Sequence, residues 1–191
     1  MHGSTFDSGD TRNIAQYERR TKALAEQGFV VISELRPKGV IQKFPEDHEK
    51  YAAKIAGQVA TLLSAGVPAA NITVSGYSRG GSLALMASGL IARADVNFVV
   101  LAGCINETGA YQKLQPWAAS YAAKLMGRFL SIYDAADADF GSCASQFEKA
   151  KDVRGYREVV LKTGKGHFAF AEPEADWVAE IASWSGPAAK K

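Results

Sequence analysis

One short stretch of the chain combines a serine with closely spaced glycines, which suits nucleophilic chemistry. Gly76-Tyr77-Ser78-Arg79-Gly80 joins a β-branched run, "NITVSG", to the small, apolar helical pattern of residues 79–92. A G-x-S-x-G pattern between a strand and a helix is typical of a nucleophile on a sharp turn. The glycines remove Cβ atoms that would clash across the turn, and the amides that begin the helix favour a negatively charged oxygen. We therefore expect Ser78 to be a nucleophile rather than an incidental serine in a turn.

A serine hydroxyl attacks a carbonyl efficiently only when a base takes its proton, and the chain has three histidines. His48 lies in "PEDHEK", a polar helix start that favours an exposed position. His167 lies in "KTGKGHFAF", beyond the last predicted strand and before the last predicted helix. Open α/β sheets bind ligands at the carboxyl ends of their strands. We therefore expect His167 to be the base; the alternative is a buried histidine with backbone partners.

A carboxylate that orients the base is expected between the serine and the histidine in chain order. Asp95 and Asp152 precede predicted strands, which places them at the wrong edge of the sheet. Asp134, Asp137 and Asp139 follow a strand in "LSIYDAADADFGSC". Any of these three can orient an imidazole and stabilise its protonated form. Spacing alone does not choose among them.

The elements that must position these loops alternate between apolar β-branched runs and longer helical patterns. Hydrophobicity is continuous along the runs, as in strands buried on both faces of a parallel sheet. This alternation predicts crossover units and an α/β sheet. The predicted strands are residues 28–34, 71–76, 97–103, 127–134 and 157–164. The predicted helices are residues 12–27, 48–65, 79–92, 111–126, 143–152 and 173–184.

The composition fits one globular domain, residues 1–186, followed by a disordered tail, residues 187–191. Lys and Arg total 22 against 20 Asp and Glu, a balance that argues against a nucleic-acid or membrane-surface partner. No apolar run approaches the ~18 residues of a membrane span, and no signal peptide is visible. The sequence leaves the localisation open between the cytoplasm and secretion after processing. Two cysteines are too few for a disulfide scaffold or a four-ligand zinc site.

Together, the serine turn, the acid cluster and the "GHF" histidine resemble the α/β-hydrolase family over about residues 2–184. The resemblance implies an α/β-hydrolase-like fold, a mostly parallel sheet of about five or six strands with helices on both faces. In members of the family the acid often follows the strand end by about three residues, in a pattern like "xYGxxD". Matching "IYDAAD" to this pattern places Asp137 at the acid position, with Asp134 as the alternative.

The resemblance also implies an oxyanion hole made of two amides. One belongs to the residue after the nucleophile, here Arg79, and the other to an "HG" loop, which "HGSTF" matches at Ser4, with Thr5 as the alternative. His2 is then a structural loop residue. In the family a strand precedes "HG", whereas here Met1 stands directly before His2. We expect a fragment, a short member whose strands pair differently, or a partner chain that supplies the edge, which would favour a homodimer.

The implied reaction is hydrolysis of carboxylic esters through an acyl-enzyme, with no metal or organic cofactor. The short segment between "VVLAGC" and "GRFLSIYD" leaves no room for a large lid, which favours small or accessible esters. Tyr77 and Trp117 are candidates for the substrate pocket, and packing is the alternative for each. Rival hypotheses are a dienelactone-hydrolase-like member that cleaves lactones, a peptide-hydrolysing member, and a non-catalytic or truncated binding domain.

Cys104 and Cys143 both follow predicted strands at the active edge of the sheet. By the family's strand order they occupy neighbouring positions. A disulfide and a pair of buried free thiols fit the sequence equally well.

Overall fold

Four parallel strands form the central sheet of the protein, for which a computed structural model describes residues 14–33, 41, 43–150 and 152–186. Their order across the sheet is β1-β2-β4-β6. The strands are β1 (Thr73–Tyr77), β2 (Asn97–Leu101), β4 (Met126–Asp134) and β6 (Asp152–Leu161). All three neighbouring pairs are parallel, so the carboxyl ends of the four strands meet at one edge. The predicted α/β class is confirmed.

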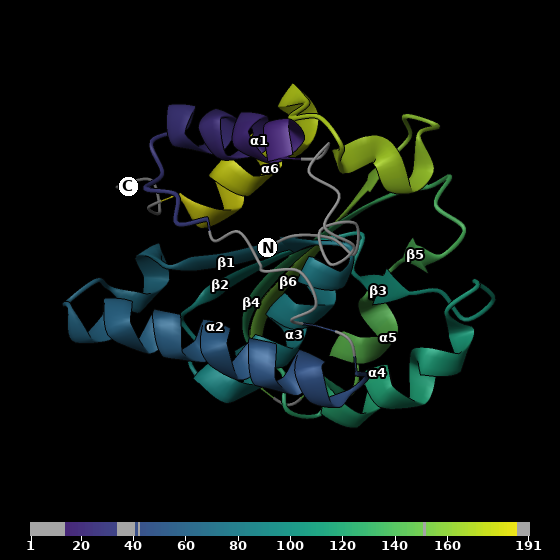
Figure 1. Ribbon diagram of the computed structural model, residues 1–191, viewed down its shortest axis with the longest axis horizontal. Helices are drawn as coiled ribbons and strands as arrows, with labels where there is room; N and C mark the ends of the chain where they lie inside the picture. The colour runs from purple at the N-terminus through teal and green to yellow at the C-terminus, as the bar shows by residue number, and fades with distance from the viewer. Residues whose placement is uncertain (1–13, 34–40, 42, 151, 187–191) are drawn as a thin grey trace.

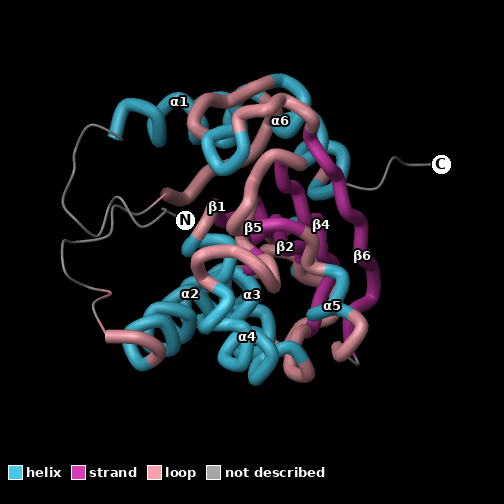
Figure 2. Tube along the Cα trace, turned by 90° about the vertical axis from the view of Figure 1, so that its right-hand side faces the viewer, coloured by secondary structure: helices cyan, strands magenta, loops and turns pink. Residues whose placement is uncertain are grey.

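The inner strands are buried because helices cover both faces of the sheet. All five residues of β2, "NFVVL", are buried. Below the sheet in Figure 1 lie α2 (Glu46–Ser64), α3 (Arg79–Ile91), α4 (Gln115–Ala122) and α5 (Ala144–Phe147). Above it lie α1 (Ile14–Glu26) and α6 (Ala175–Ser185), and Figure 2 shows the same two layers from the side.

Each face of the sheet has its own hydrophobic cluster. The cluster on the α2 and α3 face includes Leu83, Phe98 and Phe129, whose burial is complete. The cluster on the α1 and α6 face includes Trp177 and Ile181, which share one side of α6. Burial of large side chains on both faces fixes the sheet rigidly, and with it the loops at its carboxyl edge.

Short elements at this edge complete the fold. They are β3 (Cys104–Ile105), β5 (Phe140–Gly141) and the 3₁₀ helices η3 (Ala69–Asn71), η4 (Gln112–Leu114) and η5 (Gly166–Phe170). β3 and β5 pair antiparallel, with Cys104 opposite Gly141 and Ile105 opposite Phe140. This two-stranded sheet ties the loop after β2 to the loop after β4.

The prediction of a strand over residues 28–34 was wrong for the part that the structure describes, residues 28–33. These residues are in no helix or strand, and the side chains of Val30 and Ile32 are 94% and 69% exposed. A β-branched sequence favours an extended backbone, but a strand exists only where a neighbouring strand completes its hydrogen bonds. None of the four described strands of the central sheet pairs with this segment.

Other elements differ from the prediction in extent. The predicted helix over residues 111–126 is split into η4 and α4, and the one over 143–152 is shortened to α5, Ala144–Phe147. β6 begins at Asp152, five residues before the predicted start at residue 157. The predicted tail, residues 187–191, lies outside the described residues.

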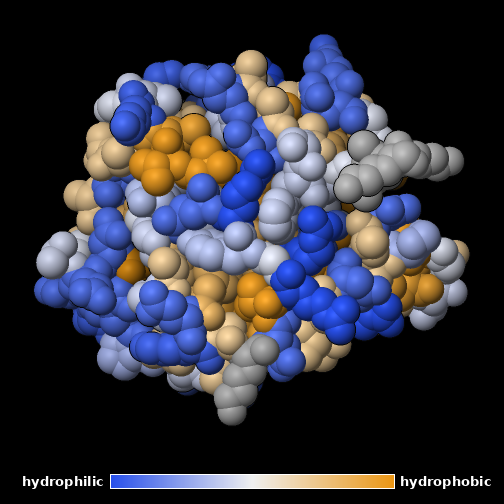
Figure 3. All heavy atoms as spheres, turned by 180° about the vertical axis from the view of Figure 1, so that it is seen from behind, coloured by the Kyte–Doolittle hydropathy of each residue, from blue (hydrophilic) through white to orange (hydrophobic). Residues whose placement is uncertain are grey.

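The surface alternates between hydrophilic and hydrophobic areas. Seen from behind, small hydrophobic areas are separated by hydrophilic residues (Figure 3). None of the described helices has the length and apolar character that crossing a membrane requires. Large apolar side chains that are exposed include Val30, Ile32, Phe44, Leu90, Tyr111, Val160 and Phe168.

Candidate active site

Ser78 lies on a strained turn between β1 and α3. Its backbone has φ 56° and ψ −125°, a conformation that costs energy for any residue other than glycine. The Ser78 amide donates to the carbonyl of Leu101 at 2.8 Å, and the Ser78 carbonyl accepts from the amide of Gly81 at 2.8 Å. The last β1 ladder bond and the first turn of α3 therefore hold the strained residue from both sides.

The first glycine of the G-x-S-x-G motif is required by close backbone contact. A Cβ atom on Gly76 would lie 2.0 Å from the carbonyl oxygen of Gly80. The start of α3 also packs against the end of β2, where a Cβ on Gly103 would lie 2.7 Å from the Cα of Gly81. Ser82, one turn into α3, donates its hydroxyl to the Gly103 carbonyl at 2.8 Å. These contacts explain why a sharp strand-to-helix turn forms here.

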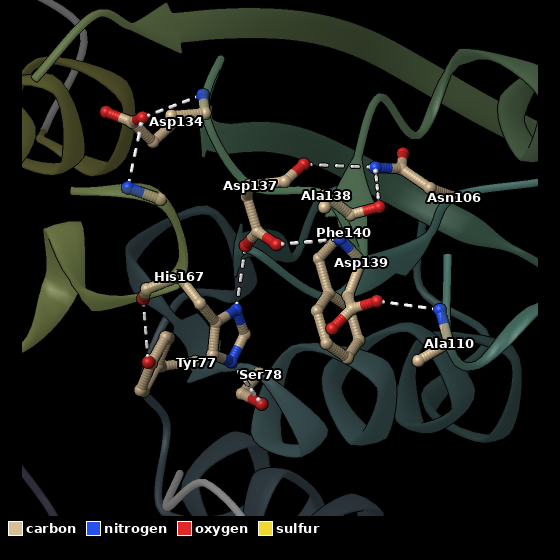
Figure 4. Close-up of polar contacts among 12 residues, drawn as sticks. Tyr77, Ser78, Asn106, Ala110, Asp134, Asp137, Ala138, Asp139, Phe140 and His167 are labelled. Carbon is tan, nitrogen blue, oxygen red and sulfur yellow. Dashed lines mark hydrogen bonds and ion pairs between the residues drawn. The ribbon is translucent and has the colours of Figure 1, made fainter. Parts of the chain in front are cut away.

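The structure brings the predicted base and acid to the predicted nucleophile (Figure 4). His167 Nε2 lies 2.9 Å from Ser78 Oγ, and His167 Nδ1 lies 2.8 Å from Asp137 Oδ2. The three residues come from the turn after β1, from the loop after β4, and from η5. The Asp137 side chain is 3% exposed and that of His167 is 28% exposed. The imidazole thus connects the buried carboxylate of Asp137 to the hydroxyl of Ser78, a residue that is itself only 7% exposed, at the carboxyl edge of the sheet.

Asp137 also accepts two backbone hydrogen bonds. The amides of Asp139 and Phe140 both donate to its Oδ1, at 3.0 Å each. Oδ1 is therefore held by the backbone of its own loop, while Oδ2 is directed at His167. This division fixes the carboxylate in the plane that the imidazole requires.

Asp134, the alternative acid, anchors the loop that carries His167. Its carboxylate accepts hydrogen bonds from the amide and hydroxyl of Thr163 at 2.9 and 2.6 Å and from the amides of Ala136 and Gly166 at 2.9 and 3.2 Å. Burial raises the pKa of this carboxyl, but the hydrogen bonds from Thr163, Ala136 and Gly166 outweigh burial and leave the pKa below its ordinary value.

Asp139, the third aspartate of the cluster, has a different partner again. Its Oδ1 accepts a hydrogen bond from the amide of Ala110 at 2.7 Å, which links the acid loop to the segment after β3. The sequence left three aspartates open, and the structure gives each a separate set of contacts. Of the three aspartates, only Asp137 forms a hydrogen bond with the His167 side chain in the described part of the chain.

Asn106, which the sequence did not single out, forms hydrogen bonds with the backbone of the acid loop, the loop after β4 that carries Asp137 and Asp139. Its Nδ2 donates to the carbonyls of Asp137 and Ala138 at 3.2 and 3.1 Å, and its amide donates to the carbonyl of Asp139 at 2.9 Å. A Cβ on Gly141 would lie 2.2 Å from Asn106 Oδ1. No short motif marks such a residue, because its partners lie about thirty positions away in the chain.

The two cysteines form a disulfide close in sequence to Asn106 and to the acid loop. Cys104 in β3 is bonded to Cys143, which precedes α5, across a sequence separation of 39 residues. The bond links β3 to the segment that follows β5 and so reinforces the pairing of these two strands. The choice that the sequence left open between a disulfide and free thiols is resolved in favour of the disulfide.

The remaining predicted site residues lie in three places. Arg79 is the first residue of α3, so its amide belongs to the helix turn whose N–H groups point toward the Ser78 side. Tyr77 is half-buried, and its hydroxyl donates to the carbonyl of His167 at 2.8 Å. Trp117 packs its ring against Phe44 and Tyr121 in the cluster between α2 and α4. Ser4 and Thr5, the candidates for the second oxyanion donor, lie outside the described residues.

Comparisons with known proteins agree with this architecture. A search of models of protein families finds no match, and neither does a search of curated proteins. Among solved structures, a variant of SOBER1 from Arabidopsis thaliana matches with a TM-score of 0.54 at 17% identity, over 75% of this chain and 66% of that one. Acetyl xylan esterase 1 from Thermoanaerobacterium matches with a TM-score of 0.52 at 16% identity, over 83% of this chain and 60% of that one.

The chain therefore spans less than two thirds of the length of either matched structure. At these identities the likeness concerns the arrangement of helices and strands. In this chain the arrangement is a parallel four-stranded central sheet with helices on both faces. The chain has the α/β-hydrolase fold.

Proposed function

We propose that the protein is a serine hydrolase that cleaves carboxylic esters of small or accessible substrates. The observation that carries this proposal is the continuous hydrogen-bonded series from Ser78 through His167 to Asp137, with distances of 2.9 and 2.8 Å. A structural serine needs neither a strained backbone nor an imidazole at its hydroxyl. The strained backbone at Ser78 is unfavourable for folding, and it is explained if Ser78 is a nucleophile that a sharp turn exposes to the substrate.

The first half of the reaction forms an acyl-enzyme. With its proton on Nδ1 and directed at Asp137, the His167 imidazole accepts the Ser78 proton on Nε2 as Oγ attacks the ester carbonyl. The resulting imidazolium then gives that proton to the departing alcohol oxygen as the C–O bond breaks. Asp137 stays ionised and stabilises the imidazolium.

The second half returns the enzyme to its starting state. Water attacks the acyl carbonyl and loses a proton to His167, and the Ser78 oxygen leaves as that proton returns to it. The net reaction consumes one ester and one water and releases one alcohol and one acid. The Arg79 amide at the start of α3 is the proposed donor to the oxyanion, with the helix dipole adding to its effect. Ser4 is the proposed second donor.

The structural neighbours favour an ester as the substrate. One of them is an acetyl xylan esterase. We carry over only the reaction class, since the identity is 16%. The partial exposure of the His167 side chain, 28%, also suits an accessible site.

A fluorophosphonate probe tests the proposal directly, because it reacts quickly only with an activated serine. We expect the adduct on Ser78 in the folded protein, located by peptide mass spectrometry, and none in Ser78→Ala, His167→Ala or heat-unfolded protein. Ser120→Ala, which removes an exposed serine hydroxyl, is the matched control and should label fully. A panel of p-nitrophenyl esters, lactones and amides then ranks the substrate classes. A folded protein that leaves Ser78 unlabelled would overturn the proposal and favour a non-catalytic binding domain.

A further inference from the structure

The imidazole of His167 lies between two aromatic rings. The Phe140 ring is stacked on it, with centroids 4.7 Å apart and planes inclined by 29°. The Tyr77 ring lies 5.0 Å away with planes inclined by 33°. Figure 4 shows Phe140 and Tyr77 on opposite sides of the imidazole. Both rings are partly buried, so neither is an incidental surface contact.

Each ring is tied to the site by a second, polar contact. The Phe140 amide donates to Asp137 Oδ1 at 3.0 Å, so one residue contacts both the carboxylate and the imidazole. The Tyr77 hydroxyl donates to the carbonyl of His167 itself at 2.8 Å. Each of the two residues therefore contacts the imidazole through its ring and a second group on which the imidazole depends: Phe140 contacts the Asp137 carboxylate, and Tyr77 contacts the His167 backbone.

Each of the two rings also packs against a further aromatic ring. The ring centroids of Tyr111 and Phe140 are 5.4 Å apart, and those of Phe170 and Tyr77 are 5.8 Å apart. Arg20 lies 5.6 Å above the centroid of the Tyr77 ring. Burial raises the pKa of Tyr77 to about 12, against the opposing effect of Arg20, so its hydroxyl keeps the proton that it donates.

We propose that Phe140 and Tyr77 are positioning residues that clamp the His167 imidazole between their faces. The proposal rests on the function proposed above, in which His167 moves the proton. A face contact leaves the imidazole free to form both hydrogen bonds in its own plane while preventing rotation about the side chain. During proton transfer the ring becomes a cation between two electron-rich faces, an attraction that is stronger in the transition state than before it.

The clamp predicts an effect on kcat that leaves KM nearly unchanged. Phe140→Leu keeps apolar bulk and the backbone amide but removes the ring face, and we expect kcat for p-nitrophenyl acetate to fall about 10-fold, since small misplacements of a base are costly. Phe140→Tyr keeps the face and should retain at least half of the activity. Phe168→Leu is the matched control: it makes the same change in the residue after His167, whose ring is 74% exposed, and should leave kcat unchanged.

A spectroscopic measurement separates positioning from general packing. We expect the proton between His167 Nδ1 and Asp137 to give a far-downfield NMR resonance. This resonance should be sharp when the imidazole is held in one orientation and broad when the imidazole moves. We expect it to be sharp in the wild type, Phe140→Tyr and Phe168→Leu, and broadened or lost in Phe140→Leu. If Phe140→Leu does not fold, Tyr77→Leu against Tyr77→Phe makes the same comparison on the other face.

Two results would overturn the clamp. One is an equal kcat and an equally sharp resonance in Phe140→Leu and Phe168→Leu. The other is a folded Phe140→Tyr that is as impaired as Phe140→Leu. Failure of the proposed function would look different, because the wild type itself would neither label nor hydrolyse esters, while the NMR comparison would still report on the imidazole.

Discussion

The carboxylate of Asp134 accepts hydrogen bonds from both the amide and the hydroxyl of Thr163, at 2.9 and 2.6 Å. This relationship joins the end of β4 to the loop that follows β6, immediately before His167. Asp134 therefore holds the loop of the proposed base in place, while Asp137, three residues further on, contacts the imidazole. The two aspartates have separate contacts, and we propose separate roles for them: Asp134 stabilises the loop, and Asp137 orients the imidazole for proton transfer.

The first prediction separates Asp137 from its neighbour Asp139. Asp137→Asn should lower kcat for a p-nitrophenyl ester by about 10⁴-fold, because an amide favours the wrong tautomer of the imidazole. Asp139→Asn keeps an oxygen that accepts from the Ala110 amide, so its activity should stay within about twofold of the wild type. Steady-state kinetics on both variants checks this. Equal losses in the two would remove Asp137 from the proposed role.

The second prediction concerns acid stability and Asp134. Because the pKa of this carboxyl is lowered in the folded protein, its ionised form is bound more favourably in the folded state than in the unfolded state. Its contribution is present in full above the ordinary pKa of 3.8 and is lost as the pH falls below that value. Replacing it with Asn should lower the free energy of unfolding at pH 7 by about 1–3 kcal/mol.

Urea unfolding of the wild type and Asp134→Asn, between pH 7 and pH 2.5, measures this contribution. The difference between the two proteins should be constant down to about pH 4 and then narrow as the wild-type carboxylate is protonated. Asp176→Asn, a change in the first turn of α6, is a control for the loss of one negative charge. A difference that widens toward low pH would contradict the assignment.

The serine turn could be predicted from the sequence because all of its determinants are local. Gly76, Ser78 and the start of α3 lie within six residues, and their backbone contacts follow from the turn itself. His167 was singled out by elimination among three histidines, and its contacts with Ser78 and Asp137 agree with that choice. The expectation that His48 is exposed was wrong, because the structure leaves this residue only 7% exposed. The fold class followed from the alternation of apolar runs with helical patterns, which long-range packing did not override.

The choice of acid and the strand at residues 28–34 depended on distant partners. Which aspartate contacts His167 is set by hydrogen bonds to loops about thirty residues away, among them those of Asn106. The exposed segment with Val30 and Ile32 has the composition of a strand, but pairing decides whether a strand forms. The two-residue strands β3 and β5 are too short for any periodicity to reveal.

The third prediction concerns the disulfide between Cys104 and Cys143. Opening a cross-link with a separation of 39 residues should lower the free energy of unfolding by about 3–4 kcal/mol, mainly because the unfolded chain gains freedom. Denaturant unfolding with and without reductant measures the loss. The double variant Cys104→Ser/Cys143→Ser should unfold at the same midpoint in both conditions, and an equal midpoint for the wild type would contradict the prediction.

The fourth prediction concerns the backbone contact at Gly76. A methyl group there would lie 2.0 Å from the Gly80 carbonyl oxygen, which is backbone at the start of α3 and has no side-chain freedom to yield. Gly76→Ala must therefore displace the turn, and since a base and nucleophile misplaced by about 1 Å react about 100-fold more slowly, kcat should fall by at least that factor.

Gly57→Ala is the matched control for this change, because Gly57 lies within α2 with nothing within 4 Å of the added Cβ. Alanine favours a helix over glycine by about 0.5–1 kcal/mol, so this variant should be more stable and equally active. Thermal unfolding and the rate of fluorophosphonate labelling at Ser78 give both quantities. Rapid labelling in a folded Gly76→Ala protein would mean that the turn tolerates the methyl group and that the close approach to Gly80 is not what holds the nucleophile.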